Sequence, residues 1–463
     1  MGNTAYQKKG DLYKTLGLIF SLALPTMLEQ LMHTAVQYID TAMVGSLGTA
    51  ATAAVGATTT VNWLVGSTLS AIGVGFLAYI SRACGAGETE KARRASAQAV
   101  LAVIFCGLLF TAVTLSLSGV IPVWMQVEEG LRPLASRYFF ILYTPMLARC
   151  ASIVFGTVLR AAGDTKTPML VGIIVNVINV VMNFLLIYPT RYISVFGIRI
   201  LMPGADLGIT GAALASALAF WVGGICISAA LWTHPKVTPR GCSFKPDASV
   251  LKPCLRVALP NAFQRFGTSM GYVVFASMVN SLGEIATAAH TVANTVESAF
   301  YVPGYGMQSA AATLSGNCYG SGDKRKLKDI SRTILAIEVI LMIISGTLLY
   351  LFAPQMMGIF SKDKEVIELG ATVLRMVALS EPFYGVSIII EGMMQGMGKT
   401  VMPLVCNVIG MWCVRIAGTF VCTQLMSYGL VSAWACMILH NMLLFVMFGA
   451  YFISGRWNPL KDK

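Results

Sequence analysis

The sequence predicts an all-α polytopic membrane protein with twelve transmembrane helices in two six-helix lobes. Three observations lead to this prediction: hydrophobic runs recur along the chain, only 12% of the residues are charged, and short motifs repeat at a fixed spacing. A soluble domain contains about 25% charged residues, so most of this chain is expected to face lipid or other membrane helices. The alternating pattern of a membrane β-barrel is absent from the sequence.

Twelve hydrophobic runs are each long enough to cross a bilayer, which takes about 20 helical residues. They lie near residues 16–40, 51–80, 95–119, 134–159, 168–188, 208–232, 253–280, 287–317, 329–352, 367–394, 402–425 and 430–454. The chain is therefore expected to cross the membrane an even number of times.

The positions of the 33 Lys and Arg residues predict the orientation of these spans. If the N-terminus lies inside, 23 of them fall in inner loops and termini and 5 in outer loops. This asymmetry places both termini in the cytoplasm. The net charge of +12 is then a topology signal and does not indicate nucleic-acid binding. The polar first fifteen residues and the missing cleavage site predict no removable signal peptide.

The two halves of the chain are related by a repeat with an offset of 235 residues. The matching motifs are "ALP" at 23–25 and 258–260, "SLG" at 46–48 and 281–283, "CGAGE" at 84–88 with "YGSGD" at 319–323, and "GDTKTP" at 163–168 with "GKTVMP" at 398–403. We expect an N-terminal lobe over 1–235, a cytoplasmic linker over 236–250 and a C-terminal lobe over 251–463. Six spans per half make the repeats parallel, and two such lobes can open a central cleft alternately to either side.

The first predicted helix carries a polar stripe. At 100° per residue, Thr26, Glu29, His33, Gln37 and Asp40 share an arc of about 80°, and the two acids lie about 16 Å apart along the axis. The stripe is either a self-satisfied seam between helices or a path for an ion or proton. Two acids and a histidine exceed what helix packing requires, and charged groups in a bilayer are costly, so we favour the second interpretation.

Two further features of the first half are candidates for function. Pro25 interrupts the first helix and predicts a kink, either static or acting as a hinge. In the fifth span, Asn179 and Asn183 are four residues apart and share a face. Their amides can coordinate Na⁺ or form hydrogen bonds between helices.

In the second half, Gln264 and Arg265 stand in the seventh span, Glu297 in the eighth and Glu381 in the tenth. An isolated arginine in a bilayer is costly, so we expect Arg265 to pair with Glu297 or Glu381, with contact to substrate as the alternative. A substrate cavity between the lobes is predicted to involve Gln37, Asn62, Gln264, Arg265, Glu297 and Glu381.

The sequence also excludes several classes of site. "GMMQGMGKT" at 392–400 lacks the first glycine of an ATP-binding P-loop, because Met393 stands there, and no strand precedes it. We see no nucleophile triad and no zinc site, so an enzyme and a resident cofactor are not expected. The one metal site that the sequence suggests is a Na⁺ site near Asp40.

The paired loops, the "IDTAMVGSLG" segment at 39–48 and the duplicated six-span pattern resemble the multidrug and toxic compound extrusion (MATE) family. The resemblance covers about residues 15–455. It implies a V-shaped bundle of two lobes and a monomeric antiporter of a bacterial plasma membrane. Such an antiporter exports lipophilic, often cationic, compounds by alternating access, in exchange for H⁺ or Na⁺.

The resemblance also bears on single residues. It matches Asp40 to the acidic residue of the first MATE helix. Bending of that helix is linked to substrate release in the family, which favours a hinge role for Pro25. One branch of the family combines this acid with an Asn and a second acid in the fifth helix. This chain has Asn179 but Asn183 in place of that acid, which favours H⁺ over Na⁺. Two rivals remain: a flippase for lipid-linked precursors, with Arg265 in a cationic cavity, and an uncoupled channel-like protein.

Overall fold

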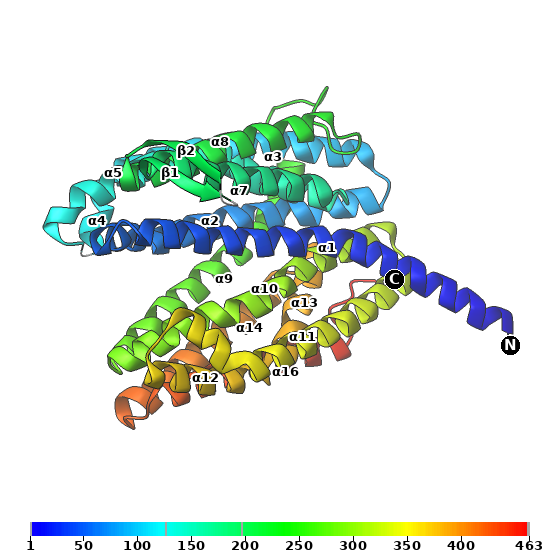
Figure 1. Ribbon diagram of the computed structural model, residues 1–463. Coiled ribbons are helices and arrows are strands. Elements are labelled where there is room, and N and C mark those ends of the chain that lie inside the picture. The colour runs from blue at the N-terminus through cyan, green and yellow to red at the C-terminus, as the bar shows by residue number, and fades with distance from the viewer. Residues whose placement is uncertain (1, 126, 196–197, 461–463) are drawn as a thin grey trace.

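The computed structural model describes residues 2–125, 127–195 and 198–460, and within these the chain is almost entirely helical (Figure 1). The elements of the first half are α1 Gly2–Gly45, α2 Thr49–Gly85, α3 Thr89–Ser116, α4 Ile121–Trp124, η1 Glu129–Leu131, α5 Arg132–Tyr143, α6 Met146–Ala161, α7 Lys166–Leu186, β1 Pro189–Val195, β2 Ile198–Ala205 and α8 Gly208–Thr233.

The second half repeats this order without the strands. Its elements are α9 Ala248–Asn280, α10 Glu284–Ser321, α11 Lys324–Phe360, α12 Lys364–Ala378, α13 Glu381–Gly396, α14 Val401–Ile409, η2 Gly410–Ile416, α15 Ala417–Phe420, η3 Val421–Leu425 and α16 Leu430–Ile453. The segments η2 and η3 are π-helical, so the eleventh span is continuous but locally underwound.

The spans follow the predicted order, and two of them are bent. Among the described residues, eight helices are long and hydrophobic enough to cross a membrane. The pairs α5–α6 and α12–α13, with bends of 48° and 55°, each meet the same criteria of length and composition when taken together. α9 and α10 fall outside this group, although they are 33 and 38 residues long. Both pack between the two halves of the molecule, where polar residues are better tolerated than against lipid.

Two strands lie between α7 and α8. Residues 189–207, which separate the predicted spans 168–188 and 208–232, contain the antiparallel strands β1 and β2. Their pairing satisfies backbone groups that a bare loop would leave to solvent.

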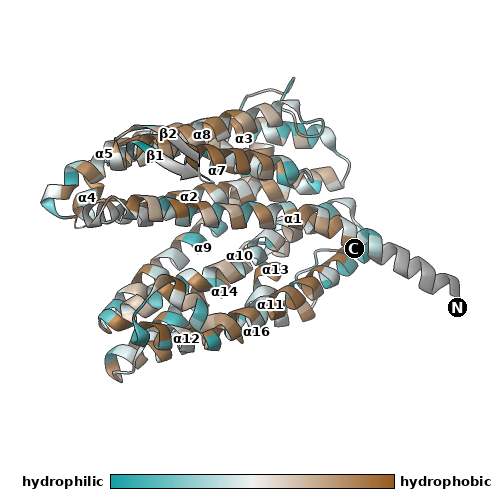
Figure 2. Ribbon diagram, viewed as in Figure 1, coloured by the Kyte–Doolittle hydropathy of each residue, from teal (hydrophilic) through white to brown (hydrophobic). Residues whose placement is uncertain are grey.

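The surface of the helices suits a bilayer. In Figure 2, hydrophobic residues cover most of α7, α8 and α16. Large apolar side chains stay exposed on helix faces, such as Phe105 on α3, Ile225 on α8 and Ile343 on α11. An exposed apolar surface of this extent indicates contact with membrane lipid.

The helices form two bundles that diverge from one end, as the two arms of a V (Figure 1). α1–α8 make the upper bundle in this view and α9–α16 the lower one. They separate toward the end with α4, the strands and α12, and approach each other near the two chain termini. The outer side predicted from the charges is the open end of the V.

α1 belongs to both bundles. Its inner part contributes Ile19, Leu22 and Ala23 to an apolar cluster whose other members lie between Met307 and Leu460. Its outer part contributes Met43 and other residues to the core of the first half. The reciprocal contact pairs α9 with α2. The first helix of each half therefore packs against the second helix of the other half.

Candidate functional site

Asp40 is held by amide groups from the fifth span. Asn183 on α7 donates from Nδ2 to Asp40 Oδ1 at 2.6 Å. Asn179, one turn earlier, has its amide 2.7 Å from the same oxygen when its own oxygen accepts from Ser216 Oγ on α8. Asn179 and Asn183 are 6% and 1% exposed, whereas Asp40 is half-buried. The structure thus brings together Asp40, Asn179 and Asn183, and it adds Ser216, which the sequence did not single out.

This arrangement suits a carboxyl group in either protonation state. A carboxylate accepts from amide NH₂ groups, and a protonated carboxyl can donate to an amide oxygen once the amide rotates. Asn183 Oδ1 is buried and has no hydrogen-bond partner among the described residues. A carbonyl oxygen without a hydrogen-bond partner, next to a carboxylate, can bind a small cation or accept a hydrogen bond from the protonated carboxyl group.

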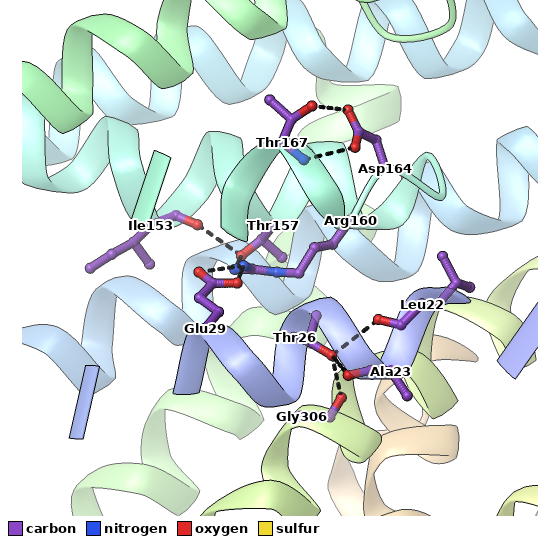
Figure 3. Close-up of polar contacts among 10 residues, drawn as sticks. All are labelled: Leu22, Ala23, Thr26, Glu29, Ile153, Thr157, Arg160, Asp164, Thr167 and Gly306. Atoms are coloured by element: carbon purple, nitrogen blue, oxygen red, sulfur yellow. Dashed lines mark hydrogen bonds and ion pairs between the residues drawn. The ribbon is translucent and has the colours of Figure 1, made fainter. Parts of the chain in front are cut away.

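Glu29 lies in a separate ion pair near the middle of α1. Arg160 on α6 donates from Nη1 to Glu29 Oε1 at 3.1 Å and Oε2 at 3.0 Å, and Arg160 Nη2 lies 3.3 Å from Thr157 Oγ1 (Figure 3). His33 and Gln37 are exposed on α1 between the two acids. The predicted stripe therefore contains two distinct carboxylate environments, one with a cation and one with amides.

Pro25 lies where α1 touches the other bundle. Beside it, Thr26 Oγ1 donates to Gly306 O on α10 at 2.8 Å (Figure 3). Proline removes the amide hydrogen that would bond to the carbonyl of Ser21. Thr165 Oγ1, from the "GDTKTP" turn, lies 3.3 Å from that carbonyl oxygen and satisfies it instead.

The second half has a polar cluster around a single carboxylate at the equivalent place. At the 235-residue offset, Gln264 corresponds to Glu29 and Gln395 to Arg160. Gln264 Nε2 and Gln395 Nε2 donate to Glu391 Oε1 at 2.8 and 2.9 Å, and Asn407 Nδ2 donates to Oε2 at 3.1 Å. Where the first half pairs a carboxylate with an arginine, the second half surrounds one with three amides. Glu391 is a further candidate that sequence reasoning missed.

The expected pairing of Arg265 with Glu297 or Glu381 is corrected. The ion pairs among the described residues do not include Arg265, and its Nε donates to Asn261 Oδ1 on the same helix at 3.0 Å. The second bundle contains another arginine, Arg415 in the π-helical η2, which is 3% exposed. The guanidinium of Arg415 packs against the rings of Phe275 and Tyr272, with its central carbon 4.2 and 4.7 Å from the ring centres.

The second bundle contains two other buried carboxyl groups, one on α11 and one on α13. Glu381 begins α13 and keeps one buried oxygen without a partner among the described residues. Glu338 on α11 occupies a slot beside Gly304 and Gly385, and neither of its oxygens has a described partner. Glu338 was also missed, although it lies within the predicted span 329–352.

Asn62, expected in the substrate cavity, contacts an arginine of its own bundle. Arg149 on α6 donates from Nη1 to Asn62 Oδ1 at 2.6 Å. The Arg149 guanidinium also packs on the rings of Phe220 and Tyr143. These contacts stabilise and position the positive charge of Arg149 inside the first bundle.

A match to a sequence profile shows the family to which this chain belongs. The profile of the MatE family matches residues 25–185 and 260–421, more than half of the chain, with one match in each half. The chain belongs to the MatE family. MATE proteins are multidrug efflux transporters, so this protein is a multi-pass membrane transporter and not an enzyme.

Relatives and solved structures agree with this assignment. A probable multidrug resistance protein NorM of Thermotoga maritima is 28% identical over 95% of this chain and 92% of its own. A probable multidrug resistance protein YoeA of Bacillus subtilis is 25% identical over 93% and 91%. A transporter of the MOP superfamily from Pyrococcus furiosus, at 23% identity, superposes with a TM-score of 0.87 over 96% of both chains.

A MATE transporter solved in an outward-facing conformation is similar to the same degree, with a TM-score of 0.87, 23% identity and coverage of 96% of both chains. These structural matches support the two-lobe fold.

Proposed function

We propose that this MATE transporter exports lipophilic, often cationic, compounds in exchange for protons, with Asp40 as the coupling carboxyl group. The observation that carries the proposal is the 2.6 Å hydrogen bond from Asn183 to Asp40 within a buried amide cluster of the first bundle. Proton uptake removes the charge of Asp40 and changes which amide atoms can bond to it. An ion drives a transition only if its affinity differs between the two conformations.

α1 is the element that can transmit this change. It carries Asp40 near its outer end, and it contacts α10 through Thr26 and through Tyr38, whose hydroxyl donates to Thr295 O at 2.9 Å. A rearrangement around Asp40 therefore acts on a helix that joins the two bundles. Substrate would bind between the bundles at the open end of the V and be released outward.

Proton coupling is preferred to Na⁺ coupling because the cluster contains one carboxylate. Asp40, Asn179 and Asn183 would offer Na⁺ one charged and two neutral ligand groups, which compensates less charge than two carboxylates. Asn183 Oδ1 nevertheless gives Na⁺ a free ligand atom, so the test includes both ions.

The test measures ethidium transport in vesicles under a pH gradient alone and under a Na⁺ gradient alone. Asp40→Asn keeps the shape and the hydrogen bonding but does not titrate. We expect the variant to bind ethidium and to lose transport driven by the pH gradient, while Asp329→Asn, at an exposed position of α11, pumps like the wild type. Wild-type pumping by Asp40→Asn under the pH gradient would refute the role of Asp40.

We further propose that both termini face the cytoplasm of a bacterial plasma membrane. The excess of Lys and Arg at one end supports this orientation. Single cysteines placed in 86–94 or 320–328 should react only with reagent added on the cytoplasmic side, and those in 190–192 only with external reagent. The reverse pattern would invert the direction of transport proposed here.

A further inference from the structure

A cationic cleft lies at the end of the molecule where the two bundles approach each other. It has a volume of about 430 Å³, within the range of about 300–1,000 Å³ typical of small-molecule sites. α2 contributes Arg82 at its C-terminal end, α9 contributes its first turns, and the turn after α13 contributes Gly398. The lining residues are Arg82, Ala248, Ser249, Lys252, Pro253, Arg256, Val257 and Gly398.

The charge of this cleft has one sign. Its lining contains the three cations Arg82, Lys252 and Arg256 and no acidic side chain. Lys252 and Arg256 are exposed and one helical turn apart, so they share a face of α9. Arg82 is fixed by its Nε, which donates to Ala78 O at 2.8 Å. An inner-side charge bias explains how many cations this end has, but not why three of them line one cleft.

An apolar groove, which we call the leucine groove, continues from the cleft. It shares Ala248, Lys252 and Arg256 with the cleft and is otherwise lined by Pro246, Leu251, Leu255 and Leu259. Leu255 and Leu259 are 53% and 52% exposed. The cationic cleft and the leucine groove therefore form one amphipathic surface along α9.

We propose that this surface binds an anionic phospholipid, with the phosphate of its headgroup in the cleft and an acyl chain along the leucine groove. Lysine and arginine clusters between membrane helices near the cytoplasmic surface attract anionic headgroups. A zwitterionic lipid would bring a positive charge of its own to a cleft whose lining has three cations and no acidic side chain. The adjacent acid, Asp247, already accepts hydrogen bonds from Ser249. The groove favours a lipid over a soluble phosphate compound, which would leave the exposed leucines uncovered.

The bound lipid would connect the two halves of the transporter. Arg82 belongs to the first half, whereas Lys252 and Arg256 belong to the second. A phosphate between them holds the bundles together at the end where they already meet. Anionic lipid is thus expected to favour the arrangement that is open at the opposite end. This site is independent of the coupling ion and of Asp40.

The experiment titrates the purified protein in detergent with phosphatidylglycerol or phosphatidylcholine and counts retained lipids by native mass spectrometry. The test variant is K252Q/R256Q. The control K326Q/K328Q removes the same number of exposed positive charges near the same end of the molecule. These two lysines lie on α11, away from the leucine groove. Equal thermal midpoints of the lipid-free proteins establish that both variants fold.

We expect the wild type and the control to prefer phosphatidylglycerol, and K252Q/R256Q to bind it about 25-fold more weakly, or about fivefold for each cation removed. Equal affinity for the two lipids in the wild type, or equal losses in the two variants, would overturn the proposal. Displacement of phosphatidylglycerol by sodium phosphate would also overturn it, because the site would then bind a soluble anion.

Discussion

Removal of the Arg160 charge is expected to destabilise the protein more than removal of both charges of its ion pair. Arg160→Gln leaves Glu29 partly buried without a cation. The double variant Glu29→Gln/Arg160→Gln has two neutral amides that can bond to each other. In the second half, Gln264 and Gln395 occupy the equivalent positions, and both donate to Glu391, which has no counterpart in the first half because Gly156 stands there.

The geometry of the pair sets the size of the effect. Both contacts with Glu29 come from one nitrogen of Arg160, so the pair lacks the two parallel bonds of the strongest arginine–carboxylate contacts. The side chains of Arg160 and Glu29 are 18% and 27% exposed. Breaking a fully buried pair costs about 3–5 kcal/mol, and an exposed pair contributes about 0–1 kcal/mol. We therefore expect Arg160→Gln to cost about 2 kcal/mol, a roughly 30-fold change in the folding equilibrium.

Reversible unfolding in mixed micelles with increasing denaturing detergent measures this free energy. Lys91→Gln breaks the exposed Glu88–Lys91 pair and provides the control, with an expected loss much smaller than that of Arg160→Gln because solvent screens the exposed pair. The double variant should lie within about 1 kcal/mol of the wild type. The reasoning fails if the double variant loses as much as the two single variants combined, or if Arg160→Gln loses no more than Lys91→Gln.

Two further predictions concern α1. A Cβ at Gly306 would lie 2.6 Å from the backbone of Met27, so Gly306→Ala should cost about 1–3 kcal/mol by overpacking, whereas Gly358→Ala, with open space around it, should not destabilise the fold. Thermal unfolding in detergent compares the two, and equal midpoints would exclude a tight α1–α10 contact. Thr165→Val should cost about 1 kcal/mol by removing the donor to the carbonyl that Pro25 leaves free. The same change should cost less in a Pro25→Ala background, where the helical amide replaces that donor; an undiminished loss there would contradict this role.

Hydrophobic runs and the internal repeat were sufficient to predict the helices and their order, because each span must bury its own backbone in helical hydrogen bonds. The bends at residues 144–145 and 379–380 were not predicted, since a hydrophobic run has the same composition whether it is straight or bent. The strands β1 and β2 were also missed. They lie in a segment outside the bilayer, where water can satisfy a loop and the membrane imposes no constraint.

The site was partly predictable for a similar reason. Helical spacing placed Asn179 and Asn183 on one face, and the MATE resemblance associated that face with Asp40. The partner of Arg265 was not predictable, because pairing between helices depends on their rotation. Glu338 and Glu391 carried the same signal as Asp40, an acid within a predicted span, and a uniform application of that rule would have included them.

The position of α1 has a consequence for the biogenesis of the protein. Thr26 forms its bond with Gly306, which follows 280 residues later in the chain. At about 5–20 residues per second, a ribosome needs roughly 15–60 s to supply this partner. During that time the inner part of α1, with Ile19, Leu22 and Ala23, lacks its partners from the second half and can contact only lipid or the insertion machinery. The first helix to be made is therefore among the last to reach its final packing, and a chain interrupted in its second half leaves the first half unfinished as well.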